Sequence, residues 1–156
     1  EVLLASRLDA QAAVFTPQPV DVIALAAEEA AQVGAELQAT EARLIVPGGE
    51  RLLRRALRNL LENAKRYGGG EITLHAARVG SLIELRVCDR GAGVPEALRE
   101  RIFAPFCRLP GHAEREGGVG LGLALVKQSA LRHGSIVRCE ANPGGGSCFV
   151  LSLPAA

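Results

Sequence analysis

Residues 50–67, with the sequence ERLLRRALRNLLENAKRY, form the most strongly patterned stretch of this 156-residue chain. The charged side chains fall on one side of a helical projection, and three glycines at positions 68–70 follow as a helix stop. An apolar stripe recurs on the other side at three- and four-residue spacing: Leu53, Leu57, Leu60, Leu61 and Ala64. The stretch therefore predicts an amphipathic helix that must pack its apolar face against a second layer.

The segments on either side of this helix supply that second layer. Residues 71–89 predict a hairpin that turns at Val79-Gly80-Ser81, and residues 135–153 predict another with a long glycine turn. Further elements are predicted by period and by Gly/Pro punctuation: helices at 1–14, 20–35, 96–102 and 120–133, and a short strand at 42–49. We therefore expect an α+β two-layer sandwich, with a mixed, mostly antiparallel sheet of about five strands on about three helices.

Composition excludes several classes of function. Hydrophobic residues make up 48% of the chain, which argues against disorder. The net charge of +1 and the 3% aromatic content offer no nucleic-acid surface. The four cysteines show no CxxC spacing, which argues against zinc and suits a reducing compartment: Cys88, Cys107, Cys139 and Cys148. No apolar run approaches the roughly 20 residues of a membrane span, and we see no signal peptide, so we expect a soluble chain.

The strong helix also carries candidate ligand side chains. Asn59 and Asn63 are four residues apart and so share one helix face, at the border of its apolar stripe. Amide oxygens are neutral, hard ligands suited to Mg²⁺, although two polar side chains on such a border can also simply be solvated. Arg66 follows within a turn and is a candidate phosphate ligand.

A carboxylate follows the second strand of the first hairpin. In CDRGAGVP, residues 88–95, Asp89 ends an apolar run, and Gly91 and Gly93 let the backbone approach a flat ligand. Such a carboxylate can accept a hydrogen bond from an exocyclic amine such as that of adenine, although Asp and Gly also make ordinary turns. Ser147, which opens the last strand in GGGSCFVLSL, could donate near Asp89, or belong to a plain hairpin.

A glycine-rich helix start lies between the two hairpins. In GGVGLGLALVK, residues 117–127, alternate glycines lead into a helix N-terminus, which is a ready site for phosphate or a flexible hinge. The stretch is neither a Walker A loop nor a Rossmann fingerprint. In FAPF, residues 103–106, Phe103 and Phe106 are expected to be core anchors at the entry of a loop that can act as a lid.

In this order, NLLENAKRY, DRGAGVP, FAPF, GVGLGL and GGGS resemble the N box, first glycine box, F box and two later glycine boxes of one family. It is the catalytic ATP-binding domain of bacterial two-component sensor histidine kinases, also called HATPase_c or GHKL. The resemblance covers residues 20–153 and implies a Bergerat-type ATP-binding fold. It implies that residues 1–14 are the end of the dimerisation and phosphoacceptor helix with its linker. Residues 15–156 would be the catalytic ATP-binding domain, with ATP and Mg²⁺ as ligands.

The resemblance also implies residue roles. Asn63 would be the Mg²⁺ ligand, Asn59 and Arg66 would support metal and phosphate as the other catalytic positions, and Asp89 would hold the adenine amino group. Arg115 is a weaker phosphate candidate. The other implied ATP-binding positions are Tyr67, Gly91, Gly93, Phe103, Phe106, Arg108, Gly118, Val119, Gly120, Leu121, Gly122 and Ser147.

Departures from the family pattern shape the functional expectation. Val119 stands where the family usually has Ser or Thr, and the lid is short. None of His75, His112 and His133 lies in the H-[DE]-x-[NT] pattern of a phosphoacceptor, and His133 is expected to cap a helix C-terminus instead. The accepting histidine is therefore expected upstream of residue 1, so the chain would bind ATP without phosphorylating itself.

Three functions remain open at this point. The family implies transfer of the γ-phosphoryl group to a histidine of the dimerisation domain, with a response regulator downstream. The full-length kinase would be a homodimer on the cytoplasmic side of an inner-membrane receptor, and the fragment a monomer or weak dimer. A serine/threonine kinase of the anti-sigma type and a non-catalytic module are the alternatives. In hydrolytic relatives a glutamate stands one turn before the metal asparagine, and here that position is Asn59, which cannot be a general base.

Overall fold

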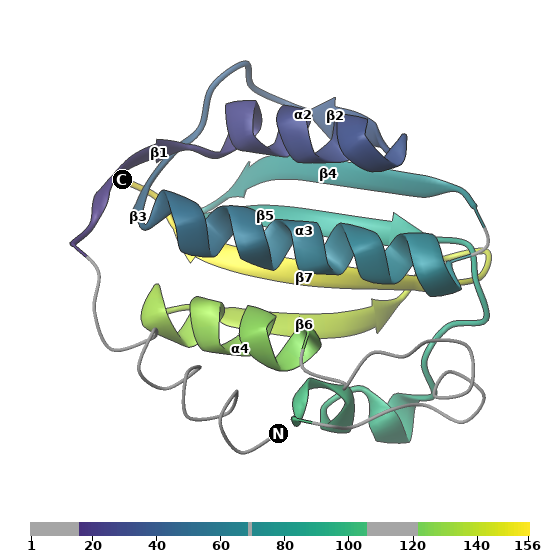
Figure 1. Cartoon of the computed structure of the whole chain (residues 1–156). Coiled ribbons are helices and arrows are strands. Elements are labelled where there is room, and N and C mark those ends of the chain that lie inside the picture. Colours follow the sequence, from purple (N-terminus) through teal and green to yellow (C-terminus); the bar gives the residue numbers. More distant parts are fainter. Residues whose placement is uncertain (1–15, 69, 106–121) are drawn as a thin grey trace.

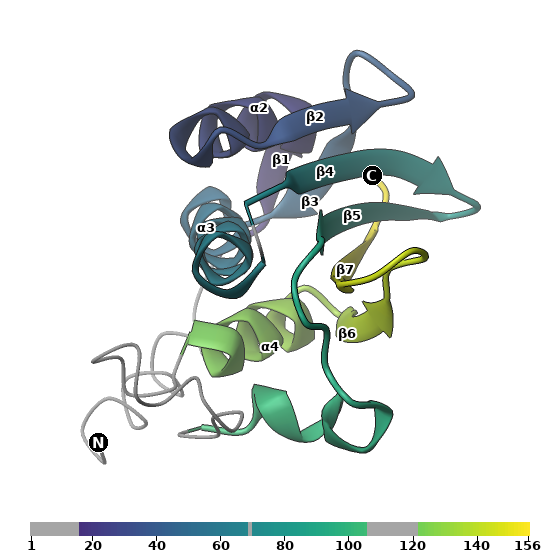
Figure 2. The same cartoon turned by 90° about the vertical axis from the view of Figure 1, so that its right-hand side faces the viewer.

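In the computed structural model of the chain, three α-helices cover one face of a five-stranded sheet, and no described helix covers the other face (Figures 1 and 2). The structure describes residues 16–68, 70–105 and 122–156. The helix end expected at 1–14 and the loop before the last helix lie outside the described residues. The expected two-layer α+β sandwich is confirmed.

The sheet runs in the order β2 (Glu36–Ala39), β4 (Ile72–Val79), β5 (Leu82–Asp89), β7 (Ser147–Pro154) and β6 (Ile136–Ala141). Only the β2–β4 pair is parallel among these neighbours. The α-helices are α2 (Val22–Val33), α3 (Glu50–Tyr67) and α4 (Gly122–Arg132). A separate antiparallel pair joins β1 (Gln18–Asp21) to β3 (Ile45–Gly48), and two short 3₁₀ turns are η1 (Glu96–Leu98) and η2 (Arg101–Phe103).

The central helix α3 has the bounds that its apolar stripe predicts. All five stripe residues, from Leu53 to Ala64, are at most 2% exposed and belong to the main core with sheet residues such as Leu74, Leu85 and Leu151. The helix ends at Tyr67, before the glycines, as predicted, and its last hydrogen bond runs from the Gly68 N–H to the Ala64 carbonyl at 2.7 Å. Burial of this stripe sets the rotation of α3 and therefore which way its polar border faces.

Two sequence-based expectations about secondary structure need correction. Residues 96–102 form the two 3₁₀ turns η1 and η2 rather than one short helix. Strands β1 and β2 were not predicted, and β2 is a mostly exposed strand that pairs with β4 at the sheet edge. Its Glu-Leu-Gln-Ala sequence has weak strand propensity, so only the tertiary pairing makes it a strand.

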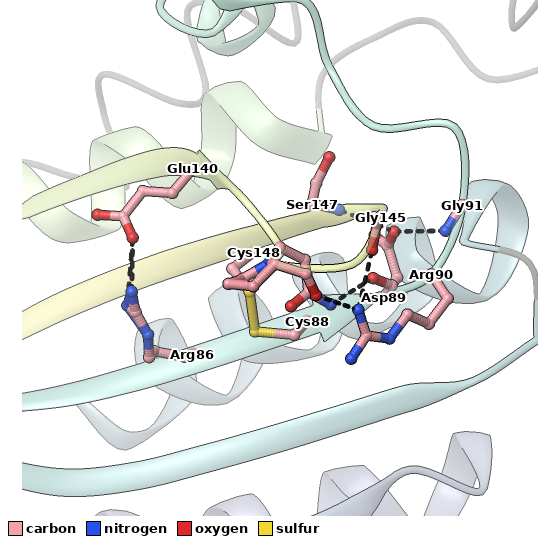
Figure 3. The surroundings of a disulfide bond; sticks show 11 residues. Arg86, Cys88, Asp89, Arg90, Gly91, Glu140, Gly145, Ser147 and Cys148 are labelled. Carbon is pink, nitrogen blue, oxygen red and sulfur yellow. Dashed lines mark hydrogen bonds and ion pairs between the residues drawn. A yellow bond between two sulfur atoms is a disulfide. The ribbon is translucent and has the colours of Figure 1, made fainter.

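The open face of the sheet carries a polar layer. Arg86 and Glu140 form an ion pair, and Arg138 bridges Glu140 to Glu84. At the end of the same face, Cys88 and Cys148 form a disulfide across β5 and β7 (Figure 3). The composition suggested a reducing compartment, and nothing in the cysteine spacing indicated this pair, because the two residues are 60 positions apart.

Among the described residues, no helix combines the length and the apolar character needed to cross a membrane.

Candidate functional site

Asp89, the last residue of β5, is held by main-chain donors from two other parts of the chain. Its Oδ1 accepts the Gly91 N–H at 3.0 Å and the Ser147 N–H at 3.2 Å, and the residue is only 6% exposed (Figure 3). Of the two roles that the sequence left open for Ser147, donation near Asp89 is the one observed, and the donor is the backbone amide rather than the hydroxyl. The carboxylate is therefore oriented rigidly at the point where β5 ends and β7 begins.

Glycines surround this carboxylate because the backbone passes too close for a side chain. A Cβ at Gly68 would lie 2.6 Å from the Asp89 Cβ, and one at Gly91 would lie 2.3 Å from the Tyr67 carbonyl oxygen. At Gly146, which has φ of +98°, a Cβ would lie 2.0 Å from the Asp89 carbonyl oxygen. Three glycine segments, after α3, after β5 and before β7, thus converge on one aspartate.

Two side chains that the sequence analysis did not single out hold the glycine turn against β5. The Asn142 Nδ2 donates to the Asp89 carbonyl at 2.7 Å, and the Arg90 guanidinium donates to the carbonyls of Pro143 and Gly145. Arg90 lies inside the DRGAGVP motif, and Asn142 opens the glycine turn, so their positions were visible. Their hydrogen bonds could not be predicted from the sequence, because they form only when the sheet brings the glycine turn beside β5.

The asparagines of α3 lie beside the start of α4. The Asn59 Nδ2 donates to the Gly122 carbonyl at 3.3 Å, which brings the helix border together with the last of the alternating glycines. Asn63, one turn later, is half-buried, and no hydrogen bond joins its amide to another described residue. Its carbonyl oxygen can therefore serve a ligand. Arg66 is exposed and Tyr67 half-buried on the last turn of the same helix.

Of the other predicted site residues, Phe103 lies in the core, and most of the rest lie outside the described residues. Phe103 is buried and meets Phe149 edge to face, with ring centroids 6.1 Å apart, which confirms the expected core anchor. The remaining lid and phosphate-loop positions lie outside the described residues and stay predictions: Phe106, Arg108, Arg115, Gly118, Val119, Gly120 and Leu121.

A buried carboxylate positions α3 against α2. Glu29 is 1% exposed, and it accepts hydrogen bonds from Arg58 at 2.8 and 3.1 Å and from Arg54 at 2.8 Å. The hydrogen bond from Arg58 is the main reason that the pKa of Glu29 is lowered from its ordinary value, against the opposing effect of burial. Because Arg58 directly precedes Asn59, this ion-pair cluster anchors the helix segment that carries the site.

The donor set at this site suits a nucleotide and magnesium. Within residues 16–68, 70–105 and 122–156, no three His, Cys, Asp or Glu side chains come together as a metal centre. An amide oxygen such as that of Asn63 is the kind of single protein ligand that Mg²⁺ accepts while it keeps waters and phosphates. The Asp89 carboxylate is held in a fixed orientation among glycines, and a carboxylate of this kind can accept a hydrogen bond from an amine.

Residues 48–156 match the family model for histidine kinase-, DNA gyrase B- and HSP90-like ATPases. The chain belongs to this ATPase family. Within the family, its similarity to named sensor kinases confirms the resemblance to the catalytic ATP-binding domain of histidine kinases. The adaptive-response sensory kinase SasA of Parasynechococcus marenigrum (strain WH8102) is 34% identical over 155 residues. That match covers 90% of this chain and 40% of SasA, so the chain spans less than half of that kinase.

Solved structures of ATPase-family members support the same assignment. The ATP-binding domain of PrrB from Mycobacterium tuberculosis superposes with a TM-score of 0.71 at 32% identity, covering 91% of this chain and 99% of PrrB. Full-length ShkA, solved in complex with AMPPNP, superposes with a TM-score of 0.81 at 28% identity, covering 99% of this chain and 34% of ShkA. The structural similarity and the sequence similarity therefore both indicate the ATP-binding domain of a histidine kinase.

Proposed function

We propose that this chain binds ATP around Asp89 and Asn63 and presents the γ-phosphoryl group to a histidine of a sensor kinase's dimerisation domain. The observation that carries the proposal is the fixed carboxylate of Asp89. Because the two backbone N–H groups of Gly91 and Ser147 engage Oδ1, Oδ2 is left to accept the exocyclic amine of adenine. The Gly91 contact is that of an ordinary Asx turn, but the Ser147 contact joins residues 58 positions apart, which a turn alone would not require.

The phosphate end of the site follows from α3 and α4. Asn59 and Gly122 bring the border of α3 to the N-terminus of α4, where unpaired N–H groups and the helix dipole favour an anion. Magnesium, held by the Asn63 amide oxygen and the phosphates, would neutralise charge on the transferring group. Arg66 stands on the last turn of α3 and would approach the phosphates from the same helix. The AMPPNP complex of the relative ShkA supports a nucleotide at this fold.

Transfer to histidine is favoured over hydrolysis by the side chains on α3. An amide at position 59 cannot accept the proton of an attacking water, and Glu62 is exposed on another face of the helix. The nucleophile would instead be a histidine imidazole from the dimerisation domain, with positioning and charge neutralisation supplying the catalysis. Residues 1–14 would be the end of the dimerisation helix and its linker, and 15–156 the catalytic domain. The cognate partner would be a response regulator, and the whole protein a receptor with this domain on the cytoplasmic side.

Calorimetric titration with ATP, with and without Mg²⁺, tests the proposal. We expect micromolar binding by the wild-type chain, which corresponds to about −8 kcal/mol. Asp89→Asn should abolish binding, and Asn63→Ala should remove its dependence on Mg²⁺. Asp21→Asn is the matched control, because asparagine also caps helices well and, among the described residues, the Asp21 carboxylate accepts only the main-chain N–H groups of Ile23 and Leu44, at the start of α2. Failure of the folded wild-type chain to bind ATP, ADP or AMPPNP would sink the proposal.

The transferase assignment needs a second readout. The chain alone should yield no acid-labile phosphohistidine from labelled ATP, and it should yield that product when the dimerisation domain of the full-length protein is added in trans. Sustained release of inorganic phosphate by the chain alone would favour a hydrolase instead.

A further inference from the structure

The disulfide between Cys88 and Cys148 lies one residue from each half of the Asp89–Ser147 contact. Cys88 directly precedes Asp89 on β5, and Cys148 directly follows Ser147 on β7. The two cysteines are paired in the β5–β7 register, with Cα atoms 4.0 Å apart (Figure 3). A covalent bond here therefore joins the two strands at the point where both enter the candidate site.

We propose that Cys88 and Cys148 are a reversible thiol–disulfide modification site for low-molecular-weight disulfides, and that its oxidation tightens the nucleotide site. The second part rests on the proposed function, whereas the first part does not. Neither cysteine is itself assigned to adenine, phosphate or metal, although each is the chain neighbour of an assigned residue, Asp89 or Ser147.

The open face of the sheet has a pocket beside one of the two cysteines. Both cysteines are nearly buried, but a small pocket on this face is lined by Cys88 together with Thr73, His75 and Arg90. In the sheet register, Thr73, Cys88, Cys148 and Glu140 form one row across four strands. A small reactant can therefore approach Cys88 from the side of the sheet that none of the described helices covers (Figure 2).

The exchange balances without any further reactant. The Cys88 thiolate attacks one sulfur of a glutathione-type disulfide, and one glutathione thiolate leaves. The Cys148 thiol loses its proton to solvent and attacks the Cys88 sulfur of the mixed disulfide, and the second glutathione thiolate leaves. The protein loses two thiol hydrogens and gains one S–S bond, while the small disulfide is reduced to two thiols. The same steps in reverse restore both cysteines.

Cys139, on β6, is a free cysteine of the same sheet with which the pair can be compared. It is buried on the helix-covered face of β6 within the main core, and burial raises the pKa of its thiol to about 11. At neutral pH it is therefore protonated and shielded. The difference between Cys139 and Cys88 is one of position, because both are 7% exposed but only Cys88 lines the pocket on the open face.

Oxidation acts on the site through the ends of the two strands. With the thiols reduced, Asp89 and Ser147 are kept together by the strand ladder and by their own hydrogen bond at 3.2 Å. With the disulfide formed, neighbouring backbone atoms are tied covalently, so fewer conformations separate the carboxylate from its donor. Reciprocity then requires nucleotide to stabilise the disulfide by the same factor by which the disulfide strengthens nucleotide binding.

The pair is tested first by thiol counting. A Cys107→Ser/Cys139→Ser chain, which keeps only the two cysteines of interest, is equilibrated with mixtures of reduced and oxidised glutathione. Alkylation and mass spectrometry should show both thiols lost together, with a linked Cys88–Cys148 peptide that dithiothreitol reverses. Two thiols that stay free in excess oxidised glutathione, or a stable glutathione adduct on one of them, would overturn the modification site.

Two readouts on the same samples test the coupling. The oxidised chain should bind AMPPNP at least about five-fold more tightly than the reduced chain. The amide protons of Gly91 and Ser147 should exchange more slowly in the oxidised chain even without nucleotide. A Cys88→Ser/Cys148→Ser chain is the control. Its AMPPNP affinity and its amide exchange rates should not change with the ratio of reduced to oxidised glutathione.

The outcomes separate the two proposals. Slower amide exchange on oxidation without nucleotide binding in either state would reject the proposed function and support the modification site. Nucleotide binding with equal affinity and equal exchange in both states would reject the coupling and leave the proposed function intact.

Discussion

His133 accepts a hydrogen bond through Nε2 from the main-chain N–H of Gly49, at 3.0 Å, so the residue that follows α4 is bonded to the N-cap residue of α3. Its Nδ1 lies 2.7 Å from the Ser129 carbonyl, which makes Nδ1 the protonated nitrogen of a neutral ring. The expected helix C-terminal role of His133 is thereby confirmed. The imidazole thus joins the start of α3 to the end of α4, and Asn59 in the middle of α3 contacts the start of α4 at Gly122.

This contact predicts a pH dependence of stability. Burial lowers the pKa of His133 from its ordinary value, because a charged ring would be desolvated and could not accept from Gly49. Its contribution is fully present above about pH 6.5 and is lost as the pH falls below that value. Urea unfolding at pH 7.5 and pH 5.5 should show wild type losing about 1 kcal/mol more than His133→Gln. Parallel pH slopes for the two chains would contradict this role, and His75→Gln controls for the removal of a histidine.

The buried carboxylate of Glu29 predicts a large difference between adjacent substitutions. Glu29→Gln removes the charge that Arg54 and Arg58 share, and should lower the free energy of unfolding by about 2 kcal/mol at pH 7. Glu28→Gln is the matched control, because Glu28 also pairs with Arg54 but is 63% exposed. It should change stability by less than about 0.5 kcal/mol. Equal losses in chemical denaturation would show that burial does not distinguish the two pairs.

The glycine turn predicts that two neighbouring alanine substitutions differ. Gly145 and Gly146 have φ of +121° and +98°, so alanine is strained at both. A Cβ at Gly145 meets nothing within 4 Å, whereas one at Gly146 would lie 2.0 Å from the Asp89 carbonyl oxygen. Gly146→Ala should therefore weaken ATP binding by about tenfold relative to Gly145→Ala, which corresponds to about 1.4 kcal/mol. Calorimetry on both chains measures the difference, and equal affinities would mean that the turn does not shape the site.

Asn142 is predicted to position Asp89 without touching the nucleotide. Asn142→Ala removes the donor to the Asp89 carbonyl and should weaken ATP binding by about five-fold, as loss of about one hydrogen bond implies. Asn142→Ala should also speed exchange of the Ser147 amide proton, a change that a direct nucleotide contact would not cause in the free protein. Gln38→Ala, on the edge strand β2, is the control and should alter neither quantity. A weakened affinity with unchanged exchange would point to direct contact instead.

Much of this fold was predictable because its strongest signals are local. The period of α3 predicted the helix from residue 50 to residue 67, and Gly80 with Ser81 marked the β4–β5 turn. Strand β2 was missed because its pairing partner, not its own residues, makes it a strand. Asn59, Asn63 and Asp89 were predicted from motif and spacing, whereas Arg90 and Asn142 were not, because their partners lie 53 to 55 positions away.

The sequence by itself determined the helix faces, the hairpins, the glycine positions and the order of the motifs, since these depend on periodicity and on residues with special backbone freedom. Only the tertiary structure decided that Gly68, Gly91 and Gly146 meet at one carboxylate, that the imidazole after α4 bonds to the N-cap residue of α3, and that Cys88 faces Cys148. The physical reason is sheet register. Pairing β5 with β7 brings together residues about 60 positions apart, and no local pattern in either strand encodes which residue will lie opposite.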